Sequence, residues 1–219
     1  MIITIDGPAG VGKGTIAKII SKSLGFKYLD SGAMYRALAL FADLNGVSDN
    51  DSDRLKKILI DLHIQFIEDK EGERVLLNTD DVTEDIRTNE ISTLASKFAA
   101  NDIVRKILRE MQRRMIKDKD FIAEGRDMGT YVFPDAEYKF YLDADLKIRA
   151  KRRADQLKEI LGINMNEENV AKEISNRDNL DMTRESCPLH PAADAVIIDT
   201  SNMTIDEVVL KIKMVIDNA

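Results

Sequence analysis

A glycine-rich segment near the start of the chain constrains the fold more than any other feature. Residues 7–15 are GPAGVGKGT, which follows the apolar run IITID at 2–6 and leads into a stretch with helical periodicity at 15–24. Glycine permits the tight backbone turn that joins a buried strand directly to a helix, and this arrangement is typical of parallel α/β sheets. The segment therefore predicts an α/β fold.

Further apolar runs along the chain extend this prediction. They are FKYLD at 26–30, FIAEG at 121–125, KFYLDA at 139–144 and AVIIDT at 195–200. Helical periodicity fills intervals at 32–44, 103–116 and 148–161. This alternation is typical of a doubly wound protein with buried parallel strands. We expect a five-stranded parallel sheet flanked by helices, with a last helix that begins at a capping box of Thr204 and Glu207.

Two segments interrupt the alternation, and we interpret both as parts of a single domain spanning 1–219. In the first, HIQFIE and RVLLN flank DKEGE at 69–73, which predicts a β-hairpin inside an insertion at about 32–105. In the second, a polar stretch within about 146–185 predicts helices that project from the sheet as a lid. No repeat or Gly/Ser linker marks a boundary between independent domains.

Composition limits the ligands and the location. The 39 Asp and Glu outnumber the 32 Lys and Arg, and the net charge of −7 opposes general binding of nucleic acid or anionic membranes. With one cysteine the chain cannot form an internal disulfide, and with only two histidines besides it has few ligands for a structural zinc ion. No apolar run approaches the roughly 20 residues of a membrane span, and no basic leader opens the chain. We expect a cytoplasmic protein, and the lack of a long unmatched apolar stripe favours a monomer.

The glycine-rich loop also predicts a phosphate-binding site. Its backbone N–H groups can turn inward around phosphate oxygens, and the following helix N-terminus adds partial positive charge. Lys13 supplies a full charge and Thr15 a hydroxyl for Mg²⁺, although the strict P-loop pattern has that hydroxyl where Gly14 stands. The predicted nucleotide-binding residues are Gly7, Pro8, Ala9, Gly10, Val11, Gly12, Lys13, Gly14 and Thr15.

Several motifs together resemble one enzyme family. Gly-Lys-Gly-Thr in the loop and LDSGAMYR at 29–36 are similar to the nucleoside monophosphate kinases, and within that family the chain most resembles the bacterial cytidylate kinases. The other motifs are IRT at 86–88, AS at 95–96 with VR at 104–105, EGRDMGT at 124–130 and RDNLDMTR at 177–184. The resemblance spans nearly the whole chain. It implies a P-loop NTPase fold with a nucleoside-monophosphate-binding insertion and a helical lid.

The resemblance implies transfer of the γ-phosphoryl group of ATP, with Mg²⁺, to CMP or dCMP. The acceptor phosphate is already mostly dianionic at neutral pH, so catalysis needs positioning and positive charge rather than a general base. At one position the family commonly has Asp, and this chain has Glu124. The predicted catalytic residues are Lys13, Arg126, Arg149, Arg153 and Arg184.

Side chains in these motifs suit a cytosine nucleotide. Cytosine offers an amino donor beside two acceptors, and Asp127, Ser96 and Arg105 supply the complementary groups. Uracil would turn its O4 acceptor toward Asp127 at a cost of about 1 to 3 kcal/mol, so CMP should be preferred to UMP. In the family, Arg177 and Asp181 are candidates for the ribose side. The predicted substrate-binding residues are Ser31, Tyr35, Arg36, Ser96, Arg105, Arg126, Asp127, Arg177, Asp181 and Arg184.

Structural roles compete with several of these assignments. Ser31 stands where a helix N-cap belongs, and Tyr35 also suits core packing. Asp127 also suits an ion pair with an arginine such as Arg184, and the arginines at 149–153 also suit a solvated helix face. Rival functions are a kinase of the same fold acting on UMP or shikimate, and a nucleotide-binding regulator without turnover. A GTPase is disfavoured because no Asn is followed by Lys.

Overall fold

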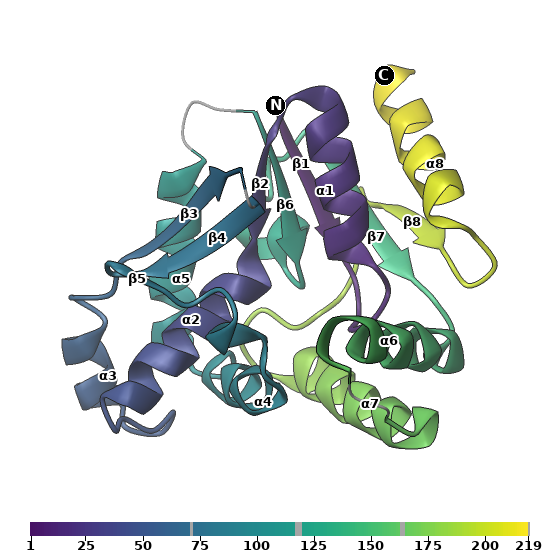
Figure 1. Cartoon of the computed structure of the whole chain (residues 1–219). Coiled ribbons are helices and arrows are strands. Elements are labelled where there is room, and N and C mark those ends of the chain that lie inside the picture. Colours follow the sequence, from purple (N-terminus) through teal and green to yellow (C-terminus); the bar gives the residue numbers. More distant parts are fainter. Residues whose placement is uncertain (71, 117–119, 163–164, 219) are drawn as a thin grey trace. The chain divides into compact units, whose positions relative to one another are not determined.

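A computed structural model describes residues 1–218 apart from 71, 117–119 and 163–164. The chain forms two compact units, one of Met1–Asp30 with Ile116–Ala219 and one of Ser31–Met115 (Figure 1). Residue 71 of the predicted hairpin loop and residues 163–164 of the predicted lid lie outside the described residues. The single-domain interpretation, with its insertion at about 32–105 and lid at about 146–185, stays a prediction.

The first unit is built on the predicted five-stranded parallel sheet. Its strands in spatial order are β2 (Lys27–Asp30), β6 (Phe121–Gly125), β1 (Ile2–Asp6), β7 (Tyr138–Asp143) and β8 (Val196–Asp199). Every neighbouring pair is parallel. Each strand begins and ends within about one residue of its apolar run, because buried parallel strands are apolar on both faces.

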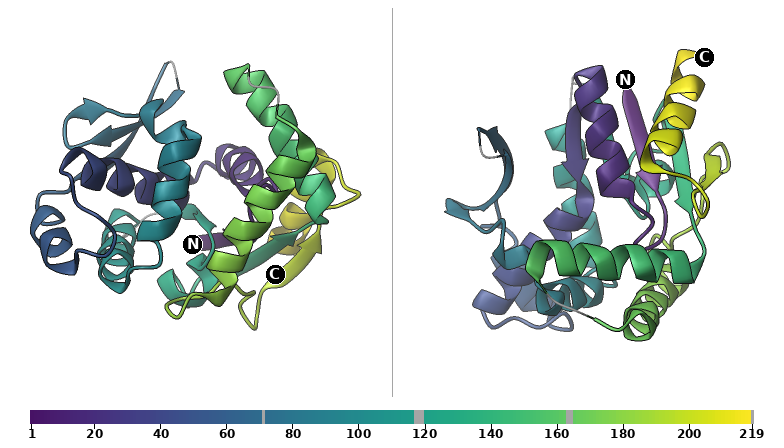
Figure 2. Two further views of the ribbon diagram at one scale, coloured as in Figure 1. Left: turned by 90° about the horizontal axis from the view of Figure 1, so that it is seen from below. Right: turned by 45° about the vertical axis from the view of Figure 1, so that its right-hand side comes forward.

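The first unit also contains four α-helices among its described residues. They are α1 (Lys13–Leu24), α6 (Leu146–Leu161), α7 (Glu167–Thr183) and α8 (Ile205–Asp217), with a π-helical turn, η2 (Met128–Val132), after β6. Helices α1 and α8 lie side by side, and α6 packs along α7 (Figures 1 and 2). The capping box of Thr204 and Glu207 at the start of α8 is confirmed. Among the described residues, no helix is long and apolar enough to cross a membrane.

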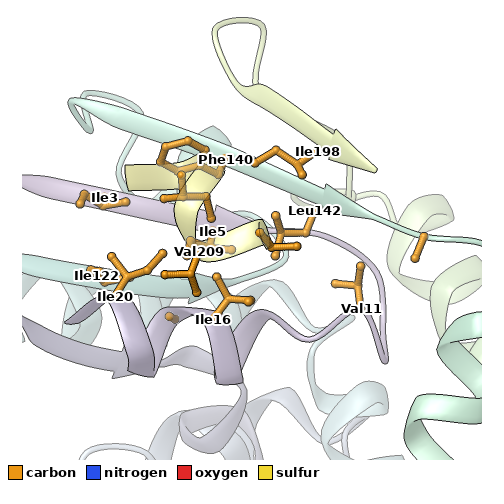
Figure 3. Packing of buried hydrophobic residues seen from close by; sticks show 14 residues of the cluster. Ile3, Ile5, Val11, Ile16, Ile20, Ile122, Phe140, Leu142, Ile198 and Val209 are labelled. Atoms are coloured by element: carbon orange, nitrogen blue, oxygen red, sulfur yellow. The ribbon is translucent and has the colours of Figure 1, made fainter. Parts of the chain in front are cut away.

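The main core of the first unit lies where α1 and α8 cover the sheet (Figure 3). Its members include Ile3, Ile5, Ile16, Ile20, Ile122, Phe140, Leu142, Ile198 and Val209. Full burial of one such side chain contributes roughly 1.5 to 3 kcal/mol. Because the core holds both the end of β1 and the start of α1, it fixes the two ends of the glycine-rich loop.

The second unit combines helices with a small antiparallel sheet. Its elements are α2 (Ser31–Leu44), α3 (Ser52–Ile58), β3 (Ile64–Asp69), β4 (Gly72–Leu77), β5 (Asp80–Asp81), the 3₁₀ turn η1 (Asp85–Arg87), α4 (Asn89–Phe98) and α5 (Asp102–Met115). The predicted hairpin is β3 with β4. Helices α3 and α4 were not predicted. Helix α3 buries only Leu55 among its described residues, so its sequence shows little helical periodicity.

Candidate active site

The glycine-rich loop of the first unit has a backbone that requires glycine. Gly7, Gly10 and Gly12 have φ angles of 148°, 76° and 97°, which side chains rarely allow. A Cβ atom at Gly7 would lie 2.1 Å from the carbonyl oxygen of Leu142. Helix α1 begins after Gly12, which has no side chain to cap the first backbone N–H groups. The loop and helix end therefore present the kind of main-chain donors that bind anions.

Lys13 lies at the first position of α1 and is buried, with 6% of its surface exposed. Its Nζ donates to the carbonyl oxygen of Pro8 at 2.8 Å, so the loop closes around the lysine. The pKa of Lys13 is lowered to about 7, chiefly by burial and then by the positive charge of Arg126, while Glu124 opposes the shift. Binding of a polyanion would raise this pKa again, because an opposite charge favours the charged form.

Glu124 brings a carboxylate to the start of α1. A Cβ atom at Gly14 would lie 3.4 Å from Glu124 Oε1, and the Tyr28 hydroxyl donates to the same oxygen at 3.3 Å. Thr15 is exposed on α1. Among the described residues, no group of three or more His, Cys, Asp or Glu could hold a metal. Mg²⁺ at phosphates needs only one or two protein oxygens, so the Thr15 hydroxyl and the Glu124 carboxylate fit it.

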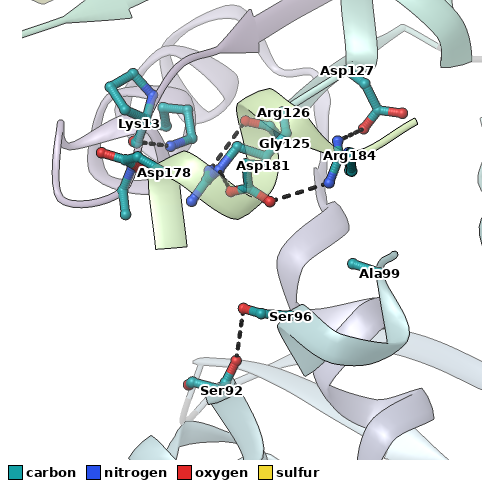
Figure 4. A network of polar contacts seen from close by, with 12 residues as sticks. Lys13, Ser92, Ser96, Ala99, Gly125, Arg126, Asp127, Asp178, Asp181 and Arg184 are labelled. Carbon is teal, nitrogen blue, oxygen red and sulfur yellow. Dashed lines mark hydrogen bonds and ion pairs between the residues drawn. The ribbon is translucent and has the colours of Figure 1, made fainter. Parts of the chain in front are cut away.

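Arg126, Asp181 and Arg184 form a charge network in the first unit (Figure 4). Asp181 Oδ2 accepts from Arg126 Nε at 2.8 Å, and its Oδ1 accepts from Arg184 Nη1 at 3.1 Å. Burial alone would raise the pKa of Asp181, but the two guanidinium groups hold it below its usual value. Arg184 Nη2 also lies 3.9 Å from Asp127 Oδ1, which is the ion pair predicted as the structural role of Asp127. One carboxylate thus orients two of the predicted catalytic arginines.

Asp6 anchors the segment that carries Arg126 and Asp127. Its two carboxylate oxygens accept from the backbone N–H groups of Met128 at 2.9 Å and Gly129 at 2.7 Å. Burial raises the pKa of Asp6 to about 7. The role of Asp6 was not predicted from the sequence. The available signal was a single acidic side chain that ends an apolar strand immediately before the loop.

The predicted lid arginines differ in their contacts. Arg149 is buried on α6, where its Nε donates to Ala144 O and its Nη1 to Ala9 O, both at 2.9 Å. Arg153 is half-buried and donates to Gln156 on the same helix at 2.8 Å. Arg177 on α7 is half-buried and contributes to the low pKa of Asp181. The solvated-face interpretation therefore fails for Arg149.

The second unit holds the other predicted substrate-binding residues. They are Ser31, Tyr35 and Arg36 on α2, Ser96 on α4 and Arg105 on α5. Arg105 is buried; its guanidinium carbon lies 5.5 Å from the centre of the Tyr35 ring, and its Nη1 donates to Ala99 O at 3.0 Å. Ser96 donates to Ser92 O within α4 at 3.2 Å (Figure 4). Tyr35 and Arg105, which are distant in sequence, are thus brought together.

The chain is similar to known proteins over nearly its whole length. The sequence model of the family described as Cytidylate kinase matches residues 3–218. The cytidylate kinase of Carboxydothermus hydrogenoformans is 45% identical over 216 residues, which cover 99% of this chain and 97% of that protein. That of Vibrio vulnificus is 43% identical over 210 residues, covering 96% and 92%. A solved structure of an uncharacterized protein from Eubacterium ventriosum shares the fold, with a TM-score of 0.53, 12% identity and coverage of 100% and 99%.

Proposed function

Because the chain belongs to the cytidylate kinase family and phosphorylates CMP with ATP, we propose that residues 7–15 bind the triphosphate of ATP. The observation that carries this proposal is the loop between β1 and α1, where positive φ angles at Gly7, Gly10 and Gly12 surround a buried lysine. Lys13 would exchange its bond to Pro8 O for the phosphate oxygens. The main-chain N–H groups would bind the remaining charge.

Mg²⁺ accompanies ATP in this proposal. Thr15 and Glu124 would hold the ion, since both present hard oxygen donors at the start of α1. When bound, Mg²⁺ supplies positive charge that neutralises phosphate oxygens. The longer side chain of Glu124, compared with an aspartate, suits contact through a water molecule.

Positive charge carries the transfer step. The transferred phosphoryl group spreads its charge over equatorial oxygens, so fixed guanidinium groups lower the barrier. Arg126 and Arg184 are already oriented by Asp181, and Arg153 lies on α6. Arg149 was also predicted to be catalytic, but its guanidinium binds a loop carbonyl, so it would act on the loop rather than on the transferred group. The acceptor phosphate has a second pKa of about 6, so no side chain needs to remove its proton.

The acceptor is recognised by side chains. Asp127 would accept from the cytosine amino group, and Ser96 and Arg105 would donate to the base. The remaining predicted contacts are Ser31, Tyr35 and Arg36 at the nucleoside and its phosphate, and Arg177 and Asp181 at the ribose. Two arginines already hold Asp181 in place. The family resemblance implies that dCMP is a substrate as well as CMP.

An acceptor panel tests this function. The release of ADP from ATP is measured with CMP, dCMP, UMP and shikimate. We expect turnover of CMP and dCMP, a kcat/KM for UMP about 10- to 100-fold lower, and no turnover of shikimate. Equal turnover of UMP and CMP would contradict the role of Asp127. Absence of ADP release with every acceptor would favour a nucleotide-binding regulator.

The cytoplasmic location and the monomeric state stay predictions. The net charge of −7 supports action on small molecules rather than on nucleic acid. Sedimentation velocity measures the oligomeric state, and we expect a single species of about 24.7 kDa.

A further inference from the structure

Two charged side chains of the first unit enclose the backbone of Ala9 in the phosphate loop. The Ala9 N–H donates to Asp178 Oδ1, and Arg149 Nη1 donates to the Ala9 carbonyl oxygen, both at 2.9 Å. Arg149 also donates to Asp178 Oδ2, so the three groups form a closed ring. The side chains of Arg149 and Asp178 are only 10% and 8% exposed. Both hydrogen-bonding groups of this loop residue are therefore held by one buried ion pair.

This ring fixes the two peptide planes on either side of Ala9. All peptide bonds are trans among the described residues, and in a trans peptide the carbonyl and the N–H point in opposite directions. Because the Ala9 N–H points to Asp178, the Pro8 carbonyl points the other way, where it accepts from Lys13 at 2.8 Å. Because the Ala9 carbonyl points to Arg149, the Gly10 N–H points away from Arg149.

The surrounding packing leaves this part of the loop little freedom. A Cβ atom at Gly10 would lie 3.0 Å from the carbonyl oxygen of Arg149 and 3.2 Å from Ile174 Cδ1. Ala9 packs in a small apolar cluster with α6 and α7, whose other buried members are Ala150, Ala154, Val170 and Ile174. Arg149 is fixed in turn by its bond to Ala144 O. Removal of either charge would leave the other buried without compensation.

We propose that Asp178 is a positioning residue for ATP: together with Arg149 it sets the directions of the Pro8 carbonyl and the Gly10 N–H, and so shapes the phosphate loop. The inference rests on the proposed ATP site at residues 7–15. Asp178 acts through the loop and does not contact substrate. Arg149 acts in the same way, through the carbonyl of Ala9, rather than as a phosphate ligand.

The first test measures the affinity of the full chain for two nucleotides by calorimetry. The probes are AMP-PNP with Mg²⁺, a non-hydrolysable ATP analogue, and CMP. In Asp178→Ala we expect AMP-PNP to bind about 10- to 100-fold more weakly, because small displacements of binding groups have effects of this size, with CMP affinity within about twofold of the unaltered chain. The control is Glu173→Gln, at an exposed position of α7, which should change neither affinity.

A second variant keeps the test decisive if Asp178→Ala fails to fold. Asp178→Asn retains an oxygen for the Ala9 N–H but removes the negative charge that faces Arg149, so it should also weaken AMP-PNP selectively. Unchanged AMP-PNP affinity in the folded Asn variant would overturn the proposal. Equal weakening of AMP-PNP and CMP with a lower Tm would also overturn it, since that pattern indicates a general structural role.

A double-mutant cycle separates the two roles of Arg149. If Arg149 and Asp178 act together as one ion pair that positions the loop, the double variant Arg149→Ala with Asp178→Ala loses no more AMP-PNP affinity than the worse single variant. If Arg149 binds phosphate by itself, the losses add, and this outcome contradicts its positioning role. The unaltered chain must release ADP with CMP in parallel. If the unaltered chain releases no ADP with CMP, the proposed function is refuted. If the unaltered chain is active and the Asp178 variants bind AMP-PNP with unchanged affinity, only the positioning role of Asp178 is refuted.

Discussion

The phosphate loop at 7–15 and the second unit differ in the kind of chemical group that each offers to a ligand. In the loop at 7–15 these groups are main-chain amides and one lysine, held by glycine φ angles and the core of the first unit. In the second unit, side chains such as Tyr35, Ser96 and Arg105 stand on three helices. Amides bind the phosphate that all nucleotides share, whereas side chains distinguish bases. Changes in the loop should therefore affect every acceptor equally, and changes in the second unit should alter which acceptor is used.

The largest expected effect comes from Lys13→Ala. We expect kcat/KM to fall by about a thousandfold or more for CMP and UMP alike, because one preorganised charge at the transferred group has an effect of this order. The fold should persist, since the lysine is a buried charge rather than a core side chain. Lys22→Ala, at an exposed position of the same helix, is the control. A loss confined to one acceptor would break the distinction between the two regions.

A smaller but selective effect is expected from Arg105→Met in the second unit. Loss of a charged hydrogen-bond donor at the base should lower kcat/KM for CMP by about 10- to 100-fold and leave the KM for ATP unchanged. UMP should be affected less, so the preference for CMP should shrink. Lys106→Met, at the next and exposed position of α5, should change neither parameter. A raised KM for ATP with an unchanged preference would count against this role.

The smallest expected effect is a pH dependence confined to the loop. Burial lowers the pKa of Lys13 to about 7, so the lysine loses its proton as the pH rises from 7 to 8. If bound ATP requires the charged form, the affinity for ATP with Mg²⁺ should fall by about fivefold over this range, with proton uptake on binding. Calorimetry in two buffers measures both quantities. CMP affinity should stay constant, and a flat ATP profile in the unaltered chain would contradict the account.

The comparison also explains which features the sequence could predict. Strands β1, β6 and β7 and the loop at 7–15 were predictable because apolar runs and glycines act over short distances in the chain. Asp6 and Asp178 were not, because their partners Met128 and Ala9 lie 122 and 169 positions away. No local pattern reports such contacts.

The resemblance gave a list of site residues, whose roles stay predictions, but it did not show how these side chains contact one another. The sequence is compatible with Arg149 either in a catalytic position or on a solvated helix face. The structure buries it against the loop carbonyl of Ala9, which excludes the solvated face, and its catalytic role stays a prediction. Likewise, helix α3 escaped prediction because it buries only Leu55 among its described residues. Helix α4 escaped prediction although it buries Ile91, Ala95 and Phe98 at helical spacing.

A crystal structure with AMP-PNP, Mg²⁺ and CMP bound tests the central claim most directly. The account predicts the triphosphate within hydrogen-bond distance of the amides of residues 7–15 and of Lys13, and the amino group of cytosine within hydrogen-bond distance of Asp127. Binding of the triphosphate outside this loop, or of the base without contact to Asp127, Ser96 and Arg105, would contradict it.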